Sequence, residues 1–215
     1  MKSKDKILIL DFGSQYTQLI ARRVREIGVF SEVKPSSIST EAIIKMNPSG
    51  IILSGGPETV TISSSQKVHK SLLESKIPIL GICYGMQTIA KELGGSVVNS
   101  DVREFGHANI SDVNNSILFD SVNFDSNNLD VWMSHGDKVD KIPENFEIIA
   151  SSKDCRVAGF QNLDSNIFGL QFHPEVTHTN QGEKILSNFI FKVCGCSKNW
   201  STSDIINSMV SDVKN

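Results

Sequence analysis

The chain has 215 residues, of which 39% are hydrophobic and 21% are charged, as is ordinary for a soluble globular domain with a single core. A net charge of -3 provides no basic surface for nucleic acid or an anionic membrane, so neither is expected as a partner. No apolar run reaches the roughly 18 residues of a membrane span, and residues 1–6 lack a signal-peptide pattern. We therefore expect a cytoplasmic protein.

The N-terminal half alternates short apolar runs with amphipathic helical patterns. Continuous apolar runs of this length are typical of strands buried on both faces of a sheet. Their alternation with helices indicates parallel strands joined by crossover helices, and thus a doubly wound sheet. The predicted strands are 7–12, 30–33 and 50–54, and the predicted helices are 16–27, 41–46 and 65–74.

Cys83 lies where the apolar run 77–82 passes into a helical pattern. The surrounding Gly-Ile-Cys-Tyr-Gly at 81–85 resembles a nucleophile elbow, in which small neighbours allow a strained turn that exposes the nucleophile above the sheet. A cysteine there also lies at a helix N-terminus, which favours thiolate over thiol. The alternative is a buried cysteine in an ordinary turn, since free cysteine is often a core residue.

The loop Ser-Gly-Gly-Pro at 54–57 follows the third predicted strand. Its glycines allow backbone N–H groups to face a ligand, so it is an anion cradle, an oxyanion hole or merely a tight turn. It is not a Walker A loop, and no Gly-x-Gly-x-x-Gly fingerprint occurs in the sequence. Ligands of doubly wound sheets gather at the carboxyl ends of the strands, so this loop is expected to share a crevice with Cys83.

Beyond residue 95 the pattern becomes β-rich. A surface connection with one helical turn is predicted over 114–128. A polar turn is predicted at 134–137, where His135 is either a base or a structural or substrate-lining group. Short strands are predicted at 96–98, 105–110, 131–133, 146–150, 157–160 and 167–170.

His173 and Glu175 follow the last predicted strand, and Pro174 between them prevents a helix. In an extended segment, residues two apart point to the same side, so the imidazole and the carboxylate can emerge together. A cysteine that attacks a carboxamide requires an imidazole to move its proton and a carboxylate to orient that imidazole. The sequence therefore predicts a Cys83–His173–Glu175 triad.

The two motifs, Gly-Ile-Cys-Tyr-Gly-Met-Gln at 81–87 and Gln-Phe-His-Pro-Glu-Val at 171–176, together resemble the paired signature of class I glutamine amidotransferases. Within that family, 9–26, 131–139 and 173–179 resemble the glutaminase part of GMP synthases. The resemblance extends from residue 6 to about residue 196. It implies an α/β fold with a doubly wound, mostly parallel sheet flanked by helices and an added antiparallel β-rich part.

The resemblance also implies roles for individual residues. Cys83 would attack the side-chain amide of glutamine and form a γ-glutamyl thioester, His173 would act as base and acid, and Glu175 would orient it. Backbone N–H groups of Gly56 and Tyr84 would form the oxyanion hole. The substrate glutamine would be bound by Gly55, Gln87, Ser134, His135, Gly136 and Asp137. A further set either couples the glutaminase to a partner domain or provides caps and a solvated helix face: Asp11, Gln15 and Arg22.

In this family the ammonia passes to an ATP pyrophosphatase domain that converts XMP to GMP, and ATP and Mg²⁺ are expected only there. The chain has no Ser-Gly-Gly-Val-Asp-Ser loop. We expect 1–196 to form the glutaminase domain and 197–215 to be a linker and the start of the next domain, with apolar residues in helical register from 205 to 213. The synthetase part would lie in the same chain or in a separate subunit, with a homodimer forming through it.

No cofactor or metal is expected in this chain, because its cysteines lack zinc-finger or zinc-ribbon spacing. They are Cys83, Cys155, Cys194 and Cys196.

Two alternatives to GMP synthesis stay open. One is glutaminase activity for another acceptor, or a related γ-glutamyl hydrolase. The other is a catalytically silent domain that docks on a synthetase. The resemblance also implies weak activity of the glutaminase in isolation.

Overall fold

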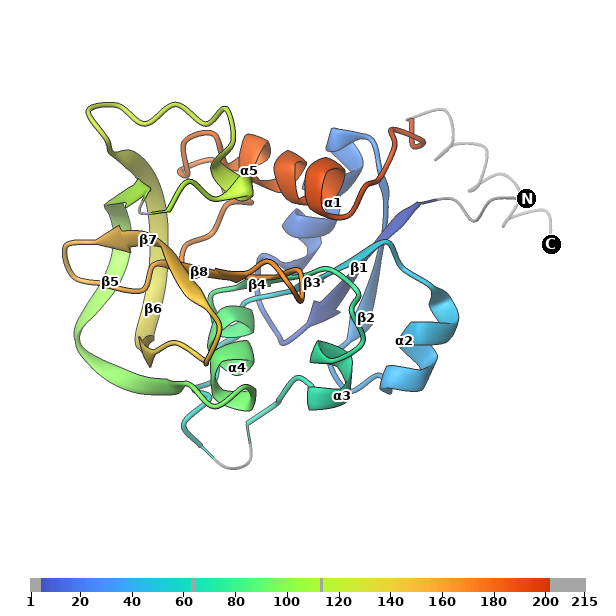
Figure 1. Ribbon diagram of the computed structural model, residues 1–215, viewed down its shortest axis with the longest axis horizontal. Helices are drawn as coiled ribbons and strands as arrows, with labels where there is room; N and C mark the ends of the chain where they lie inside the picture. Colours follow the sequence, from blue (N-terminus) through green and yellow to red (C-terminus); the bar gives the residue numbers. More distant parts are fainter. Residues whose placement is uncertain (1–4, 63–64, 113, 202–215) are drawn as a thin grey trace.

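A computed structural model describes residues 5–62, 65–112 and 114–201 (Figure 1). Within this part, the backbone forms a mixed sheet of nine strands in the order β2-β1-β3-β4-β9-β8-β7-β5-β6. The strands are β1 (Lys6–Asp11), β2 (Phe30–Pro35), β3 (Gly50–Leu53), β4 (Ile79–Ile82), β5 (Ser96–Asp112), β6 (Leu129–Lys141), β7 (Glu147–Ser152), β8 (Gly159–Asn162) and β9 (Ile167–Leu170).

The sheet divides into a parallel and an antiparallel part. Strands β2, β1, β3, β4 and β9 run parallel to one another, and β8, β7, β5 and β6 continue from β9 in antiparallel pairs. β9 therefore lies beside β4 although the whole antiparallel part separates the two strands in the sequence. This pairing brings the segment after β9 next to the segment after β4.

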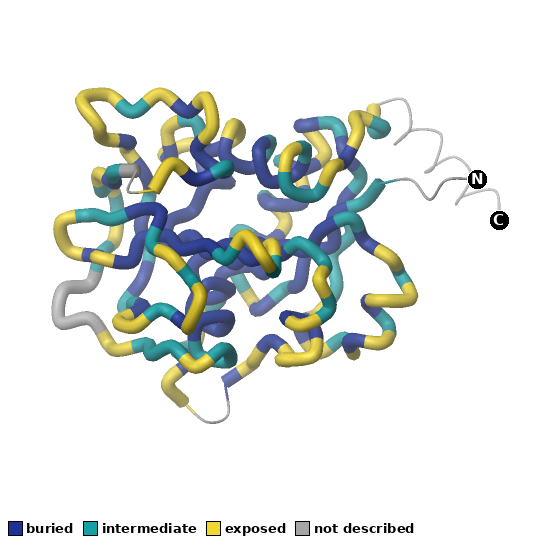
Figure 2. Tube along the Cα trace, viewed as in Figure 1, coloured by how far each residue is buried: buried dark blue, intermediate teal, exposed yellow. Residues whose placement is uncertain are grey.

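Helices cover both faces of the parallel part (Figure 1). Helices α1 (Thr17–Ile27) and α5 (Gly182–Asn188), followed by a π-helical turn (Phe189–Val193), cover one face. Helices α2 (Thr40–Met46), α3 (Lys70–Leu73) and α4 (Tyr84–Glu92) cover the other. The buried sheet runs through the centre of the molecule (Figure 2). The predicted fold class is thus confirmed.

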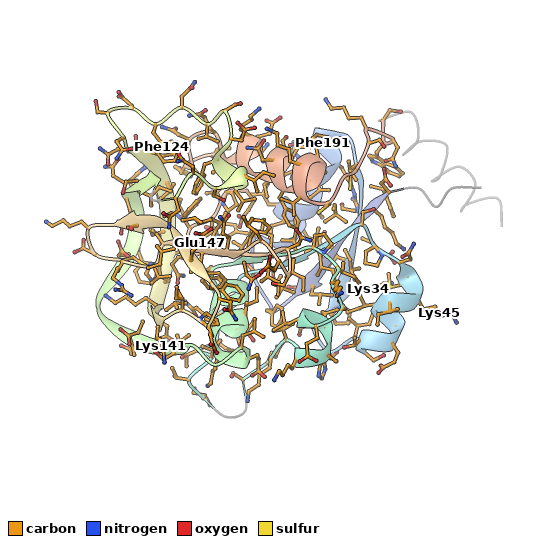
Figure 3. The ribbon with its side chains drawn as sticks, in the orientation of Figure 1. Lys34, Lys45, Phe124, Lys141, Glu147 and Phe191 are labelled. Atoms are coloured by element: carbon orange, nitrogen blue, oxygen red, sulfur yellow. The ribbon has the colours of Figure 1, made fainter. Side chains whose placement is uncertain are left out.

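The alternation of β1 shows how the two cores are separated. Ile7 and Ile9 pack with α1 and α5, whereas Leu8 and Leu10 pack with α2 and α4. Successive side chains of a strand point to opposite faces, so an all-apolar strand supplies both cores at once. Charged side chains lie at the periphery, for example the exposed Lys45 and Lys141 (Figure 3).

The predicted helix over 65–74 is wrong for its first half, because α3 covers only Lys70–Leu73. Upstream of α3, the backbone N–H of Gln66 donates to Glu58 Oε2 (3.3 Å), and that of Val68 donates to Thr88 Oγ1 (3.1 Å). These side-chain acceptors replace the carbonyls that a helix would have used, and tertiary contacts therefore override the local helical pattern.

The β-rich part also differs from the prediction. The two strands predicted at 96–98 and 105–110 are a single strand, β5, whose pairing with β6 shifts between Asn99 and Glu104. The turn predicted at 134–137 is wrong, since these residues continue β6 to Lys141. The strand predicted at 157–160 begins later, at Gly159. The connection over 114–128 contains the expected single helical turn, Ile117–Phe119.

The end of the described chain returns to the start of the sheet. The backbone N–H groups of Asn199 and Trp200 donate to Gly28 O, each at 3.0 Å, and the Trp200 ring packs on Phe30 with 4.7 Å between ring centroids. The helical register predicted over 205–213 lies outside the described residues. In the described part, no helix is long and apolar enough to cross a bilayer.

Candidate active site

Cys83 occupies the turn between β4 and α4 with φ 52° and ψ −106°, a conformation that side-chain-bearing residues rarely adopt. The flanking glycines permit this turn. A Cβ on Gly81 would lie 2.6 Å from the backbone of Gly85, and a Cβ on Gly85 would lie 2.4 Å from Leu53 O. The Gly-x-Cys-x-Gly motif therefore has a steric cause, and the predicted elbow is present.

His173 and Glu175 meet after β9. His173 Nδ1 lies 2.8 Å from Glu175 Oε1, and the two residues are only 3% and 1% exposed. The backbone that carries them is held on both sides. His173 N donates to Trp132 O at 3.0 Å, and Thr179 Oγ1 donates to His173 O at 2.6 Å. The imidazole is thus fixed in position by its own backbone and oriented by the carboxylate.

Cys83 and His173 line the same cavity and interact electrostatically. Burial is the largest influence on the His173 imidazole and lowers its pKa, but Glu175 and Cys83 together outweigh burial and raise the pKa well above 6.5. The sulfur itself lies 3.6 Å from both Ser134 O and Gln171 Nε2. The arrangement favours an imidazolium beside the sulfur, which suits a thiolate nucleophile.

A cavity of about 340 Å³ opens beside Cys83. It brings together all but one of the residues predicted for the oxyanion hole and for glutamine. The exception is Gly55, whose backbone instead lies beside the imidazole, since a Cβ there would be 3.3 Å from His173 Cε1. The lining residues are Gly56, Pro57, Glu58, Thr59, Cys83, Tyr84, Gln87, Phe105, Ser134, His135, Gly136 and Asp137.

Asp137 is buried at this cavity, and its carboxylate is held by two neighbours. Asn99 Nδ2 donates to Asp137 Oδ1 at 3.1 Å, and Thr59 Oγ1 donates to Oδ2. Gln87 Nε2 donates to Asp137 O (2.8 Å) and to Gln171 Oε1 (3.3 Å). The Gln87 amide therefore fixes β6 against α4, and the Asp137 carboxylate provides a negative charge for a cationic group of a ligand.

A second cavity, of about 300 Å³, also reaches Cys83. Of the three residues with an open role, only Gln15 lines it. Asp11 Oδ1 accepts from Gly13 N (2.8 Å) and Thr17 Oγ1 (2.7 Å), as a helix cap does. Arg22 pairs with Glu26 at 2.7 Å on an exposed helix face. The geometry of Asp11 and Arg22 thus matches the cap and solvated-face alternatives.

Sequence reasoning missed several residues of this site. Gln171 contacts the sulfur, and its position two residues before His173 on the same extended segment was the signal that could have found it. Thr59, Glu58 and the exposed Phe105 line the cavity without any local motif that would identify them. They are brought in by the loop after β3 and by the long strand β5.

His135 lies at the edge of the cavity but is committed to another neighbour. Its Nε2 lies 3.1 Å from Glu104 Oε2 on the adjacent strand. Burial is the main influence on His135, and it lowers the pKa to about 4. Burial also raises the pKa of Glu104. A neutral, buried imidazole is poorly suited to bind a proton during catalysis near neutral pH, which favours the structural or substrate-lining alternative over the base.

The site therefore combines a cysteine on a strained turn, an imidazole paired with a carboxylate, and a polar cavity. Such a set can attack a carbonyl carbon, deliver a proton to a leaving nitrogen and hydrolyse the resulting thioester. It performs acyl transfer from an amide or ester. The acyl donor is decided by what the cavity holds.

Comparison with known proteins agrees with this chemistry. The family described as glutamine amidotransferase class-I matches residues 8–193. The GMP synthase [glutamine-hydrolyzing] of Ruthia magnifica subsp. Calyptogena magnifica is 54% identical over 211 residues, and that of Pseudomonas entomophila is 51% identical over 214. These alignments cover 98% and 97% of this chain but 40% and 41% of the relatives, so the chain spans about two fifths of their length.

Solved structures extend the similarity to the fold. A crystal structure of a Thermoplasma acidophilum protein described as belonging to a GMP synthase has a TM-score of 0.79 and 32% identity, covering 91% of this chain and 96% of its own. A Thermotoga maritima glutamine amidotransferase, at 19% identity and TM-score 0.69, shares the fold. The match over residues 8–193 and the 32% identity across nearly all of a solved relative lead to one conclusion: the chain belongs to the class I glutamine amidotransferases.

Proposed function

We propose that this chain hydrolyses L-glutamine to glutamate and ammonia through a γ-glutamyl thioester on Cys83, and that the ammonia serves the conversion of XMP to GMP. The observation that carries the proposal is the pairing of a positive-φ cysteine with the buried His173–Glu175 pair at one cavity. The 54% identity to a glutamine-hydrolysing GMP synthase supports the choice of amide donor and acceptor.

In the first half-reaction, the Cys83 thiolate attacks the side-chain amide carbon of glutamine and forms a C–S bond. The carbonyl oxygen gains the negative charge, which backbone N–H groups of Gly56 and Tyr84 stabilise. The His173 imidazolium then gives its proton to the amide nitrogen, the C–N bond breaks, and ammonia leaves. The products are ammonia and the thioester.

In the second half-reaction, neutral His173 takes a proton from water while the water oxygen attacks the thioester carbon. The C–S bond breaks, glutamate forms, and the sulfur leaves as a thiolate beside a renewed imidazolium. Glu175 stays ionised and stabilises the imidazolium in both resting states. The cycle thus begins and ends with the same ion pair.

The cavity lining supplies the recognition of glutamine. The buried Asp137 carboxylate, held by Asn99 and Thr59, is positioned for the α-ammonium group of the substrate. Gln87, Ser134, His135 and Gly136 line the remainder and orient the amino-acid end. Because Asp137 is ordered before the ligand arrives, less conformational entropy is lost on binding.

The acceptor half lies in a further part of the enzyme. We infer a partner ATP pyrophosphatase domain, in the same chain or on a separate polypeptide, that uses ATP and Mg²⁺ to activate XMP. This inference is supported by relatives about two and a half times as long as this chain, which are named GMP synthases. Residues 1–196 would be the glutaminase domain, and 197–215 would lead to its partner.

The direct test is mass spectrometry of the chain quenched during incubation with glutamine. A mass increase that corresponds to one γ-glutamyl group on Cys83 is expected, and it should be absent in Cys83→Ala and persist longer in His173→Ala. Supplying an XMP-activating ATP pyrophosphatase should then increase ammonia production and yield GMP. Absence of any adduct, with glutamine left intact, would refute the hydrolysis. An adduct without GMP would refute only the acceptor.

A further inference from the structure

We propose that Glu104, His135 and Cys155 form a binding site for a divalent zinc-like metal ion, separate from the catalytic cysteine. The three residues come from three places in the antiparallel part. Glu104 and His135 are directly paired across β5 and β6, and Cys155 lies in the loop between β7 and β8. One ligand atom from each residue lies within 4.8 Å of the other two.

The polar atoms of this cluster lack partners. Neither ring nitrogen of His135 nor Glu104 Oε2 makes a hydrogen bond within the described residues, although both residues are largely buried. His135 Nε2 and Glu104 Oε2 are 3.1 Å apart without the alignment of a hydrogen bond. Buried polar atoms without partners are rare and destabilising, so their gathering at one point indicates a site that binds a ligand.

The spacing and chemistry of the three donors select the ion. Two ligands of a tetrahedral zinc ion, bound at about 2.0–2.2 Å, are separated by about 3.3 Å, close to the spacing of Nε2 and Oε2. Nitrogen, sulfur and oxygen together suit zinc, whereas calcium and magnesium prefer oxygen alone. A thiolate and a carboxylate would also neutralise the two positive charges of the ion, and water would complete the coordination.

This site is distinct from the catalytic one but adjoins it. Among the described residues that line the cavity beside Cys83, His135 is included, whereas Glu104 and Cys155 are not. The register shift of β5 between Asn99 and Glu104 sets the residue that faces His135. An ion held here would join β5, β6 and the β7–β8 loop, and would therefore stabilise the antiparallel part of the sheet.

The test uses the 215-residue chain with Cys83→Ser, so that the catalytic thiol cannot bind metal. Titration with Co²⁺ should produce one equivalent of a tetrahedral spectrum with a sulfur-to-cobalt charge-transfer band, and Zn²⁺ should displace it and raise Tm. Adding Cys155→Ser should abolish the band, and adding Glu104→Gln, which keeps the side-chain size, should weaken Zn²⁺ binding by about tenfold or more. Adding Cys196→Ser is the matched control and should change neither.

Two results would overturn the proposal. One is the absence of stoichiometric Co²⁺ or Zn²⁺ binding to the folded Cys83→Ser chain. The other is a charge-transfer band and a Zn²⁺-dependent rise in Tm that survive in the Glu104→Gln variant with unchanged affinity. Because Glu104→Gln preserves volume and polarity, its circular dichroism separates a lost ligand from a lost fold.

Discussion

Arg23 donates a hydrogen bond from Nε to the backbone carbonyl of Glu175, at 3.1 Å, across 152 residues of sequence. The same guanidinium pairs with Glu26 one turn further along α1. Helix α1 therefore fixes the loop that carries the carboxylate, and through it the orientation of His173. A residue of the helix surface thus supports the proposed catalytic pair without lining either cavity that reaches Cys83.

Replacing Arg23 with Ala should slow the reaction of Cys83. The lost bond is partly exposed to solvent, so we expect a cost of about 1 kcal/mol in the transition state, which is roughly fivefold in rate. The measurement is the rate at which a glutamine-mimicking electrophile alkylates Cys83. Arg22→Ala is the matched control, because Arg22 also pairs with Glu26 but extends into solvent. Equal rates for both variants would contradict the role of Arg23.

Gly85→Ala should destabilise the elbow, because the new Cβ would lie 2.4 Å from Leu53 O in a fixed strand. We expect a loss of about 1–3 kcal/mol in the free energy of unfolding, as for other overpacked cores. Gly94→Ala is the comparison, since Gly94 has φ +90° but a Cβ added there would meet nothing within 4 Å, so only backbone strain of about 1 kcal/mol applies. Urea denaturation measures both. A Gly85→Ala chain as stable as the parent would disprove the steric account.

Glu175→Gln should lower the pKa of His173. Burial alone opposes the imidazolium, and the carboxylate is the first of the groups that offset it, so removing the negative charge leaves burial less opposed. NMR titration of His173 should show the drop in the variant. An unchanged His173 titration in Glu175→Gln would indicate that the carboxylate has no electrostatic influence on the imidazole.

The same pair makes stability depend on pH. Because the folded-state pKa of His173 is raised, its contribution to stability is fully present below the unfolded pKa of about 6.5 and is lost as pH rises through the folded value. The loss should be smaller in Glu175→Gln. Chemical denaturation at a series of pH values tests this, and a parent-to-variant difference that is flat above pH 6.5 would contradict it.

Asp137→Asn should raise the KM for glutamine. On the proposed function, the carboxylate pairs with the substrate ammonium in a buried site, and removing one partner of such a pair costs about 2–5 kcal/mol, which is tenfold or more in affinity. The expected effect on kcat is smaller. Asp140→Asn, on the exposed end of the same strand, is the control. A kcat decrease with unchanged KM would assign Asp137 to another step.

The doubly wound half was predictable because each strand there is an uninterrupted apolar run. Ile7 to Leu10 and Ile79 to Ile82 are buried on both faces, so burial alone fixes their conformation. The elbow followed from Gly81 and Gly85, whose steric role is local. His173 and Glu175 were also recognisable locally, since only one residue separates them.

The antiparallel half was less predictable because its contacts depend on register. Gly136 interrupts the alternation of β6 and resembles a turn, yet pairing with β5 keeps the strand extended to Lys141. The approach of Glu104 to His135 depends on the irregularity after Asn99, and Cys155 joins them from a loop. Three candidate ligands from separate elements leave no spacing motif, so no pattern in the chain predicts the proposed metal site.

Cys83 borders two cavities, and this gives the site separate ways in and out. On the proposed function, the amino-acid end of glutamine fills the space lined by Asp137, while the departing nitrogen faces the space lined by Tyr16 and His173. Ammonia can then leave before glutamate moves. The order of product release is therefore set by the shape of the protein, and the nitrogen can reach an acceptor while the thioester still blocks the entrance against water from the other side.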